Sequence, residues 1–324
     1  MVEKPRWEAS LQGQPQSDEL NFDVDHALDS VVALRAAIPA DAFTASILGA
    51  ERSGSGVVIR ESGLVLTIGY LIAEAESVWL TDSNGRVTPA HALAYDQETG
   101  FGLVQALGRL GLPALDLGRS SEAKLNDPVV VAGGNRRQTI RGRIVGKQEF
   151  VGYWEYALDE AFFTAPAHPF WGGAGVIGQG GKLLGIGSLH AQRVTEDGQP
   201  QDVNMIVPID LLPPVLDDLL ALGRINKPPR PWLGVYAGES EGKIVIAGVD
   251  ERGPAAAAGL RQGDIVSAVR DRSVESLGDF YRQVWNCGPA GTEIAIEVVR
   301  DRRSTWLRIK SADRGALLKK PRLH

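Results

Sequence analysis

The sequence predicts a mainly β protein in two parts, a barrel or sandwich of short strands followed by a smaller unit that mixes strands and helices. Between residues 54 and 209, short apolar runs alternate with turn signals about every 8 to 12 residues, which is typical of all-β architectures. A helical pattern over 210–222 and a Pro-rich segment at 226–231 then separate the two parts. A length of 324 residues also favours two domains.

The apolar runs of the first part are bounded by Gly, Pro, Asn or Asp, and we interpret them as strands. The expected strands cover residues 54–59, 64–67, 78–80, 90–95, 127–134, 141–146, 153–158 and 204–209. In the helix that follows we expect Asp210 to be the N-cap and Gly223 to be the stop. Residues 1–26 are rich in Gln, Pro, Ser and acidic residues, which favours a flexible segment before an ordered domain at 27–223.

A linker at 224–230 leads to the second domain, which we place at 231–313. Its expected elements are a strand at 243–246, a short helix, turn and strand over 253–266, a helix at 277–285, and strands at 293–299 and 305–309. The tail at 314–324 is basic and is expected to be solvated.

Composition excludes several functions. A net charge of -6 argues against nucleic acid as a partner, and a single cysteine, Cys287, excludes an intramolecular disulfide and indicates an inert buried thiol. The N-terminus has no apolar stretch, so we expect no membrane anchor and a cytoplasmic location, or a periplasmic one if a leader is missing. The histidines His26, His91 and His168 have no metal-ligand spacing, and we expect neither a metal nor a cofactor.

The stretch 163–189 reads as a turn, a short apolar strand, a Gly-rich hairpin and a second apolar strand. Trp171 stands immediately before Gly172 and Gly173. Residues 173–178 match the letters GxGxxG, but a Gly-Gly-Lys turn follows at once instead of a helix, so we do not expect a nucleotide site.

The order of these segments resembles the high-temperature-requirement (HtrA, Deg-type) serine proteases, over residues 27–312. The resemblance rests on 54–59, 172–173 and 208–210 together, followed by a unit that resembles a PDZ domain of the permuted bacterial type. It implies a chymotrypsin-like double β-barrel. It also implies that Tyr70 stands at the position of the catalytic His, Gly100 at that of the Asp, and Trp171 at that of the Ser.

With these three residues the protein has no nucleophile, base or orienting carboxylate at the family's positions. The preceding loop places Pro169, which lacks an N–H, near an expected oxyanion donor. We therefore expect an inactive homologue in which Trp171 fills the vacated pocket, or else anchors a bound peptide. The alternative is a hydrolase with a rebuilt site at Ser188 and His190, a pair for which the sequence shows no third orienting group.

Resemblance to PDZ domains implies capture of peptide or protein C-termini by strand addition. The loop that holds the terminal carboxylate would be Trp232, Leu233, Gly234 and Val235, and the helix at 277–285 would flank the groove. On that helix we assign Phe280 and Val284 to the core, whereas Tyr281 could line the groove or pack inward. Family resemblance further implies a homo-oligomer, such as a trimer.

Overall fold

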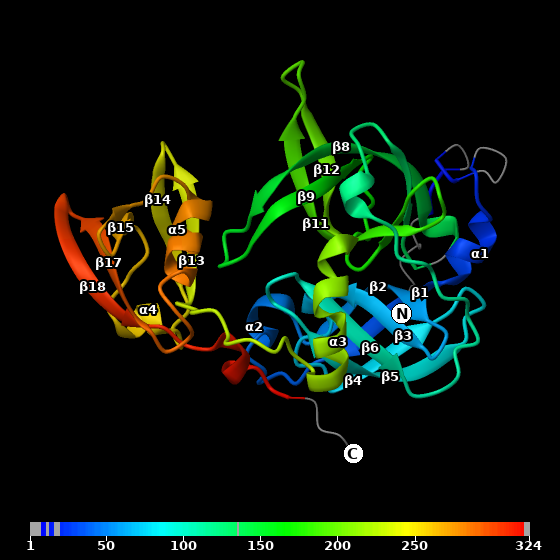
Figure 1. Ribbon diagram of the computed structural model, residues 1–324, viewed down its shortest axis with the longest axis horizontal. Helices are drawn as coiled ribbons and strands as arrows, with labels where there is room; N and C mark the ends of the chain where they lie inside the picture. The colour runs from blue at the N-terminus through cyan, green and yellow to red at the C-terminus, as the bar shows by residue number, and fades with distance from the viewer. Residues whose placement is uncertain (1–7, 11–12, 16–19, 135, 321–324) are drawn as a thin grey trace, which may run out of the picture. The chain divides into compact units, whose positions relative to one another are not determined.

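The computed structural model describes all residues except 1–7, 11–12, 16–19, 135 and 321–324. The protein forms two compact units (Figure 1). The first unit contains residues 1–148, 160–225 and 319–324, and the second contains 149–159 and 226–318. The segment 149–159 therefore belongs to the second unit, although the sequence placed it inside the first domain.

Two closed barrels make up most of the first unit. The first barrel has the strand order β1-β2-β3-β6-β5-β4, and every neighbouring pair is antiparallel. Its strands are β1 (Val31–Ala37), β2 (Glu51–Arg60), β3 (Leu64–Ile68), β4 (Ser77–Thr81), β5 (Val87–Tyr95) and β6 (Phe101–Ala106). Every residue of β3 is buried, because both faces of this apolar strand are covered.

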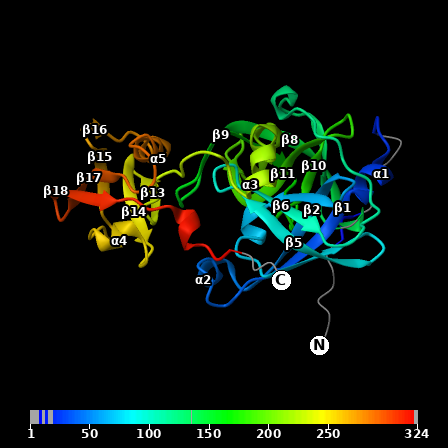
Figure 2. The same ribbon diagram turned by 60° about the horizontal axis from the view of Figure 1, so that its bottom comes forward.

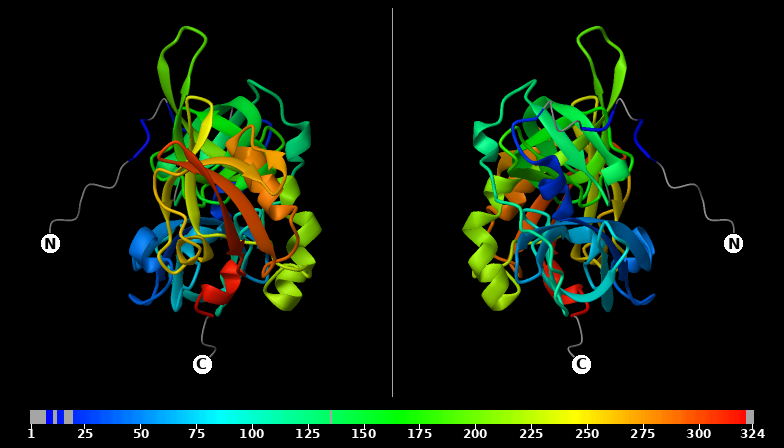
Figure 3. Two further views of the ribbon diagram at one scale, coloured as in Figure 1. Left: turned by 90° about the vertical axis from the view of Figure 1, so that its left-hand side faces the viewer. Right: turned by 90° about the vertical axis from the view of Figure 1, so that its right-hand side faces the viewer.

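The second barrel has the order β10-β11-β12-β9-β8-β7. Its strands are β7 (Pro128–Ala132), β8 (Thr139–Val151), β9 (Ala157–Ala165), β10 (Gly175–Ile177), β11 (Leu183–Val194) and β12 (Pro200–Pro208). The far ends of β11 and β12 project from this unit as a two-stranded arm (Figure 3). The barrel interpretation is thus confirmed over the sandwich.

One strand prediction in this region was wrong. The segment 153–158 was expected to be a strand, but the structure places most of it in the turn between β8 and β9, and β9 starts only at Ala157. The aromatic residues of this segment pack against one another and do not form a strand. Phe150 contacts Trp154 and Tyr156, and the Trp154 and Tyr156 rings are stacked with their centroids 5.8 Å apart.

The helices of the first unit are short. They are α1 (Val24–Asp29), α2 (Ala45–Leu48) and α3 (Pro213–Leu222), with the 3₁₀ turns η2 (Gly69–Leu71), η3 (Ser120–Glu122), η4 (Arg136–Gln138) and η5 (Ile209–Leu211). Helix α3 packs on β5 and ends at Gly223 in a left-handed conformation, as expected. Asp210 does not cap α3, however: its carboxylate accepts the backbone N–H groups of Ser120 and Ser121, at 2.9 and 2.8 Å.

Residues near both ends of the first unit form hydrogen bonds that the sequence did not predict. Within 1–26, Ala9 is buried and its N–H donates to the Arg137 carbonyl at 2.8 Å. Near the C-terminus, 3₁₀ turn η6 (Arg314–Leu317) has no buried residue and belongs to the second unit. The Lys319 N–H then donates to Glu74 at 2.9 Å, and the Lys319 ammonium pairs with Asp41.

The second unit is an antiparallel sheet with the order β13-β14-β15-β17-β18 and two helices (Figure 2). Its elements are β13 (Val235–Ser240), β14 (Lys243–Val249), α4 (Pro254–Ala257), β15 (Ile265–Val269), β16 (Arg272–Ser273), α5 (Leu277–Trp285), β17 (Glu293–Arg300) and β18 (Arg303–Lys310). The bounds of α5 match the sequence prediction. The core of this unit contains Phe280, Tyr281 and Val284 together with the inward residues of the strands.

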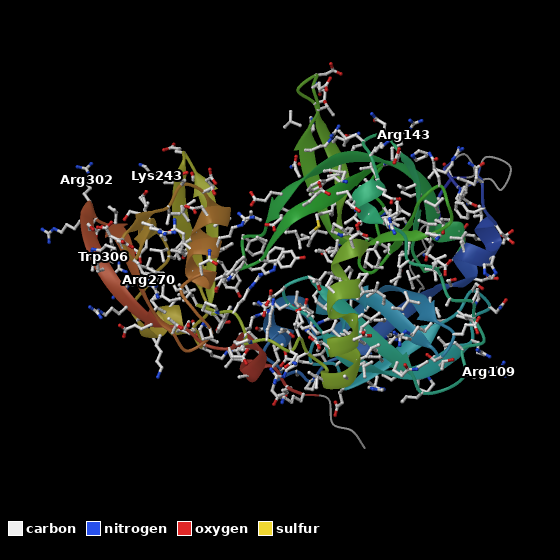
Figure 4. All side chains as sticks on the ribbon, viewed as in Figure 1. Arg109, Arg143, Lys243, Arg270, Arg302 and Trp306 are labelled. Carbon is white, nitrogen blue, oxygen red and sulfur yellow. The ribbon has the colours of Figure 1, made fainter. Side chains whose placement is uncertain are left out.

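The sheet of the second unit has two edges. One edge is β18, which carries the half-exposed Trp306 (Figure 4). The other edge is β13, and it is paired: Tyr236 forms an antiparallel bridge with Trp154 from the segment 149–159.

None of the helices among the described residues has the length and apolar character that crossing a membrane requires. Among the same residues, no group of three or more His, Cys, Asp or Glu side chains gathers as a metal site would demand.

Candidate functional site

The turn around Trp171 holds the geometry of the first candidate site. The Ala174 N–H donates to the Trp171 carbonyl at 3.0 Å, and the Gly173 N–H donates to the Gly187 carbonyl at 2.9 Å. From the first barrel, the Ser55 N–H donates to the Gly172 carbonyl at 2.9 Å. The turn is therefore fixed from both barrels.

Gly173 cannot carry a side chain in this turn. Its φ is +78°, and a Cβ atom there would lie 1.9 Å from the Ser55 carbonyl oxygen. We expect Gly173→Ala to lower the free energy of unfolding by about 2 kcal/mol, because the left-handed backbone and the clash must both be relieved. Urea denaturation would measure this loss.

Gly180→Ala is the matched control for that substitution. Gly180 lies in the adjoining hairpin, and a Cβ atom there would meet nothing within 4 Å. The free energy of unfolding of Gly180→Ala should differ from that of wild type by less than about 0.5 kcal/mol. Equal stabilities for the two variants would show that the tight turn around Gly173 is not formed.

Tyr70 lies in η2, next to the Trp171 turn. Its hydroxyl donates to the Ser188 carbonyl at 2.8 Å and also shares a hydrogen bond with the Trp171 side chain. Burial raises the pKa of the Tyr70 phenol well above its usual range, so the group stays neutral and cannot act as a base near neutral pH. The backbone of Tyr70 is held as well, because the Arg52 guanidinium donates to its carbonyl at 2.6 Å.

Gly100 contacts the first residue of η2. Its φ is +86°, and its carbonyl accepts the Gly69 N–H at 2.7 Å. The turn before it is built by Asp96, whose carboxylate accepts the Thr99 N–H and hydroxyl at 2.9 and 2.7 Å. The three positions named from the resemblance, Tyr70, Gly100 and Trp171, are thus brought together around one turn. None of these side chains is a carboxylate, an imidazole or a hydroxyl nucleophile at this point.

The loop before Trp171 does not present converging N–H donors. The His168 N–H donates to Asn204 Oδ1 at 2.6 Å, and the Phe170 N–H donates to His168 Nδ1 at 3.0 Å. Between them, Pro169 has no N–H to offer. His168 itself is buried, which lowers its pKa, and its ring is occupied at both nitrogens because Nε2 contacts the Gln138 carbonyl. This histidine has a structural role.

Ser188 and His190 do not form a catalytic pair in the structure. Ser188 is buried at a β-bulge of β11, whereas His190 is exposed. His190 Nε2 lies 3.4 Å from Asp202 Oδ1, so an orienting carboxylate that the sequence did not reveal is present. Among the described residues, however, no hydrogen bond joins Ser188 Oγ to the His190 ring, and the Trp171 ring packs 5.5 Å from that imidazole.

The second candidate site is the loop before β13. The N–H groups of Leu233, Gly234 and Val235 all point at one carboxylate, that of Glu155. Gly234 has φ +80°, and a Cβ atom there would lie 3.0 Å from the Gly253 Cα. Of the four predicted loop residues, Trp232 differs: its N–H donates to the Ala312 carbonyl at 2.9 Å instead.

The Glu155 carboxyl group is buried against this loop. Its Oε1 accepts N–H groups from Leu233, Gly234 and Val235 at 3.1, 2.7 and 3.1 Å, and its Oε2 accepts that of Leu233 at 3.0 Å. Burial raises the pKa of Glu155 to about 7, although the three N–H donors and the charge of Arg314 oppose the shift. The loop therefore holds the Glu155 carboxyl group through backbone N–H groups, and its capture of a peptide's terminal carboxylate stays a prediction.

Tyr281 lies at the same site. It is buried, and its hydroxyl donates to the Tyr153 carbonyl at 3.1 Å. Of the two alternatives that the sequence left open, the structure shows inward packing, with only the hydroxyl reaching the segment beside β13. Glu155 and Tyr153 were not among the predicted site residues, because no sequence pattern marks a glutamate as a partner of a loop about 80 residues away.

Two parts of the sequence match known protein families. Residues 54–186 match the family described as trypsin-like peptidase domain, and residues 231–310 match the PDZ domain family. The first match spans strands of both barrels, and the second contains the carboxylate-binding loop and α5.

Relatives found by sequence include serine endoproteases. The protein is 25% identical over 272 residues to the serine endoprotease DegS of Escherichia coli K12, covering 79% of this chain and 75% of DegS. It is also 25% identical over 273 residues to a probable periplasmic serine endoprotease, DegP-like, of Pseudomonas fluorescens, covering 78% of this chain and 54% of the relative.

Solved structures show the same fold. An HtrA-type protease, AlgW with decapeptide, matches with a TM-score of 0.54 and 23% identity over 92% of this chain and 98% of AlgW. A serine endoprotease from Yersinia pestis matches with a TM-score of 0.53 and 22% identity, over 90% and 98%. The protein is therefore a trypsin-like peptidase domain followed by a PDZ domain, homologous to the DegS and DegP proteases of the HtrA family.

Proposed function

We propose that this protein is a non-catalytic homologue of the HtrA proteases that acts by binding peptides or protein C-termini through its PDZ domain. The observation that carries the proposal is the cluster at the family's catalytic positions. Tyr70 and Trp171 hydrogen-bond to each other there, and Gly100 supplies only backbone. Such a cluster has no group that can attack a carbonyl carbon or take up a proton near pH 7.

The rate acceleration of a serine protease has two main sources, the triad and the oxyanion hole. Removing the triad costs on the order of 10⁶ in kcat, and the remainder depends on an intact oxyanion hole. In this protein Pro169 lacks an N–H, and the Phe170 N–H is bonded within its own loop. Neither source of rate acceleration is therefore supported.

The binding half of the proposal rests on the loop of Leu233, Gly234 and Val235. Three backbone N–H groups converge on one carboxylate there, as recognition of a peptide's C-terminus requires. AlgW, a structural relative, was solved with a decapeptide. We extend the proposal to self-association, since closed homo-oligomers are common and the family resemblance implies one. The cytoplasmic location stays a prediction.

A fluorophosphonate probe tests the absence of a serine nucleophile. We expect no covalent label on the folded protein at probe concentrations that label an active HtrA protease to completion, because activated serines react with such probes and resting serines do not. Mass spectrometry of the intact protein is the measurement. Stoichiometric labelling of one serine would contradict the proposal.

The second candidate function is a hydrolase with a rebuilt site at Ser188 and His190. The distance of 3.4 Å between His190 and Asp202 is the observation that favours it. This alternative requires the label to fall on Ser188 and to vanish in Ser188→Ala and in His190→Ala. A label that persists in both variants would exclude it.

A further inference from the structure

We propose that the turn between β8 and β9 is an internal ligand of the PDZ domain, with Glu155 in place of a peptide's terminal carboxylate. This inference rests on the proposed peptide binding and adds that the groove is closed by the protein itself. An external C-terminus can bind only after the segment 149–159, called here the plug, has left.

The plug adds to the sheet as a peptide ligand would. Trp154 forms an antiparallel bridge with Tyr236 on the edge strand β13. One residue further on, the Ala237 N–H donates to the Tyr153 carbonyl at 2.7 Å. The backbone direction from Tyr153 to Glu155 runs toward the loop at 233–235, so the carboxylate follows the added strand as a C-terminus would.

The helix that flanks the groove also binds the plug. From α5, the Tyr281 hydroxyl donates to the Tyr153 carbonyl at 3.1 Å. At the next position of α5, Arg282 contacts carboxylates at both ends of the plug, Glu149 at 2.5 Å and Asp159 at 2.8 Å. Both β13 and α5 therefore contact the plug.

Apolar contacts complete the arrangement. Val151 packs against the core of the second unit, and the Tyr153 and Tyr236 rings lie 6.1 Å apart. The plug is accordingly part of the compact second unit, although β8 and β9 otherwise belong to the second barrel.

A loop with three unpaired N–H groups would be open to any free carboxylate. Here all three are satisfied by the buried carboxyl group of Glu155, and a ligand must displace it. The apparent dissociation constant for a ligand is its intrinsic value divided by the fraction of molecules with an open groove. Removing the Glu155 carboxylate should therefore tighten binding without changing the groove.

The test uses the full-length protein and a fluorescein-labelled peptide that copies residues 147–154 and ends in an additional alanine with a free carboxylate. Fluorescence anisotropy at pH 6 compares wild type, Glu155→Ala and the control Glu160→Ala. Glu160 is a half-exposed carboxylate beyond the plug that pairs with Lys147. We expect Glu155→Ala to bind the probe about tenfold or more tightly than wild type, and Glu160→Ala to stay within about twofold of it.

Two results would overturn the inference in different ways. Equal binding by wild type and Glu155→Ala would leave peptide binding intact and show that the plug does not compete. No binding by either protein would show that a sequence copied from the plug has no affinity for the groove, and it would remove support from the proposed function as well. A probe ending in an amide should bind neither protein measurably, since it lacks the carboxylate.

Hydrogen exchange of wild type gives a test that does not depend on the folding of Glu155→Ala. Saturating probe should increase exchange in the plug, because bound probe expels it, while the amides at 233–235 stay protected. Binding of the probe with unchanged exchange at 149–159 would contradict the inference. Glu155→Gln serves as the second variant and should fall between wild type and Glu155→Ala in probe affinity.

Discussion

Glu155→Ala is expected to bind the probe more tightly than wild type, and the ratio of the two dissociation constants is expected to fall by up to roughly 50-fold as the pH rises from 5 to 8. Docking of the plug raises the pKa of Glu155 from its usual 4.5 to about 7, chiefly by burial. A raised pKa makes docking strongest below 4.5 and weakens it as the pH rises through 7. The plug therefore competes best in acid and least above neutral pH.

The groups that face Glu155 do not titrate in this window. Burial raises the pKa of the Tyr281 phenol and keeps that group neutral, and the charge of Arg314 favours the ionised form of Glu155. The carboxylate of the probe is affected equally in both proteins, so taking the ratio of their dissociation constants removes its own titration.

Anisotropy titrations at half-unit pH steps would measure this ratio. The control Glu160→Ala should keep a ratio to wild type near unity at every pH. A ratio for Glu155→Ala that is independent of pH would show that Glu155 does not change its protonation on docking.

Arg52→Met is expected to lower the free energy of unfolding of the first unit by about 3–5 kcal/mol, because it breaks a buried charged network. The buried Arg52 guanidinium donates to the carbonyls of Gly49, Tyr70 and Ala73, and to the Thr44 hydroxyl at 2.7 Å. Thr44 in turn donates its hydroxyl to the buried Glu74 at 2.7 Å. The substitution leaves these acceptors without their donor and removes the positive charge that interacts with Glu74.

Differential scanning calorimetry would measure the effect as a fall of about 10 °C in the transition of the first unit. Arg35→Met is the matched control. Arg35 pairs with Glu51 at 2.9 Å, but both side chains are largely exposed, so its loss should cost less than about 1 kcal/mol. Similar shifts for the two variants would contradict the buried network.

Local signals in the sequence predicted most of the elements. The helix α5 has the bounds that the sequence predicted, and the structure adds Ser276 as its N-cap, which accepts the Asp279 N–H. Gly223 ended α3 as expected, since a left-handed residue is needed there. These features depend on neighbours within about one turn.

Long-range partners caused the errors. Asp210 has the residue type of an N-cap, but Ser120 and Ser121, some 90 residues away, take its carboxylate. Tyr153 and Trp154 have strand propensity, but they do not continue a strand of the second barrel. Trp154 pairs with Tyr236 of β13, which lies about 80 residues further along the sequence. A single sequence contains no signal for such pairs.

The same distinction applies to the sites. The positions that the resemblance assigns to the catalytic residues could be named from the sequence, and Gly100 and Gly173 have positive φ in the turns at these positions. The loop at 232–235 could be named in the same way. Glu155, the residue that fills it, could be found only from the structure, because its role depends on three N–H groups from a distant part of the sequence.

Hydrolysis of fluorescein-labelled unfolded casein by purified wild type tests the central claim most directly. Trp171→Gly, which opens the space beside Tyr70, and an active HtrA protease would be assayed in parallel. The account predicts no cleavage above the blank by wild type or by Trp171→Gly. Cleavage by wild type that persists through repurification and is abolished by one substitution, Ser188→Ala first, would contradict it.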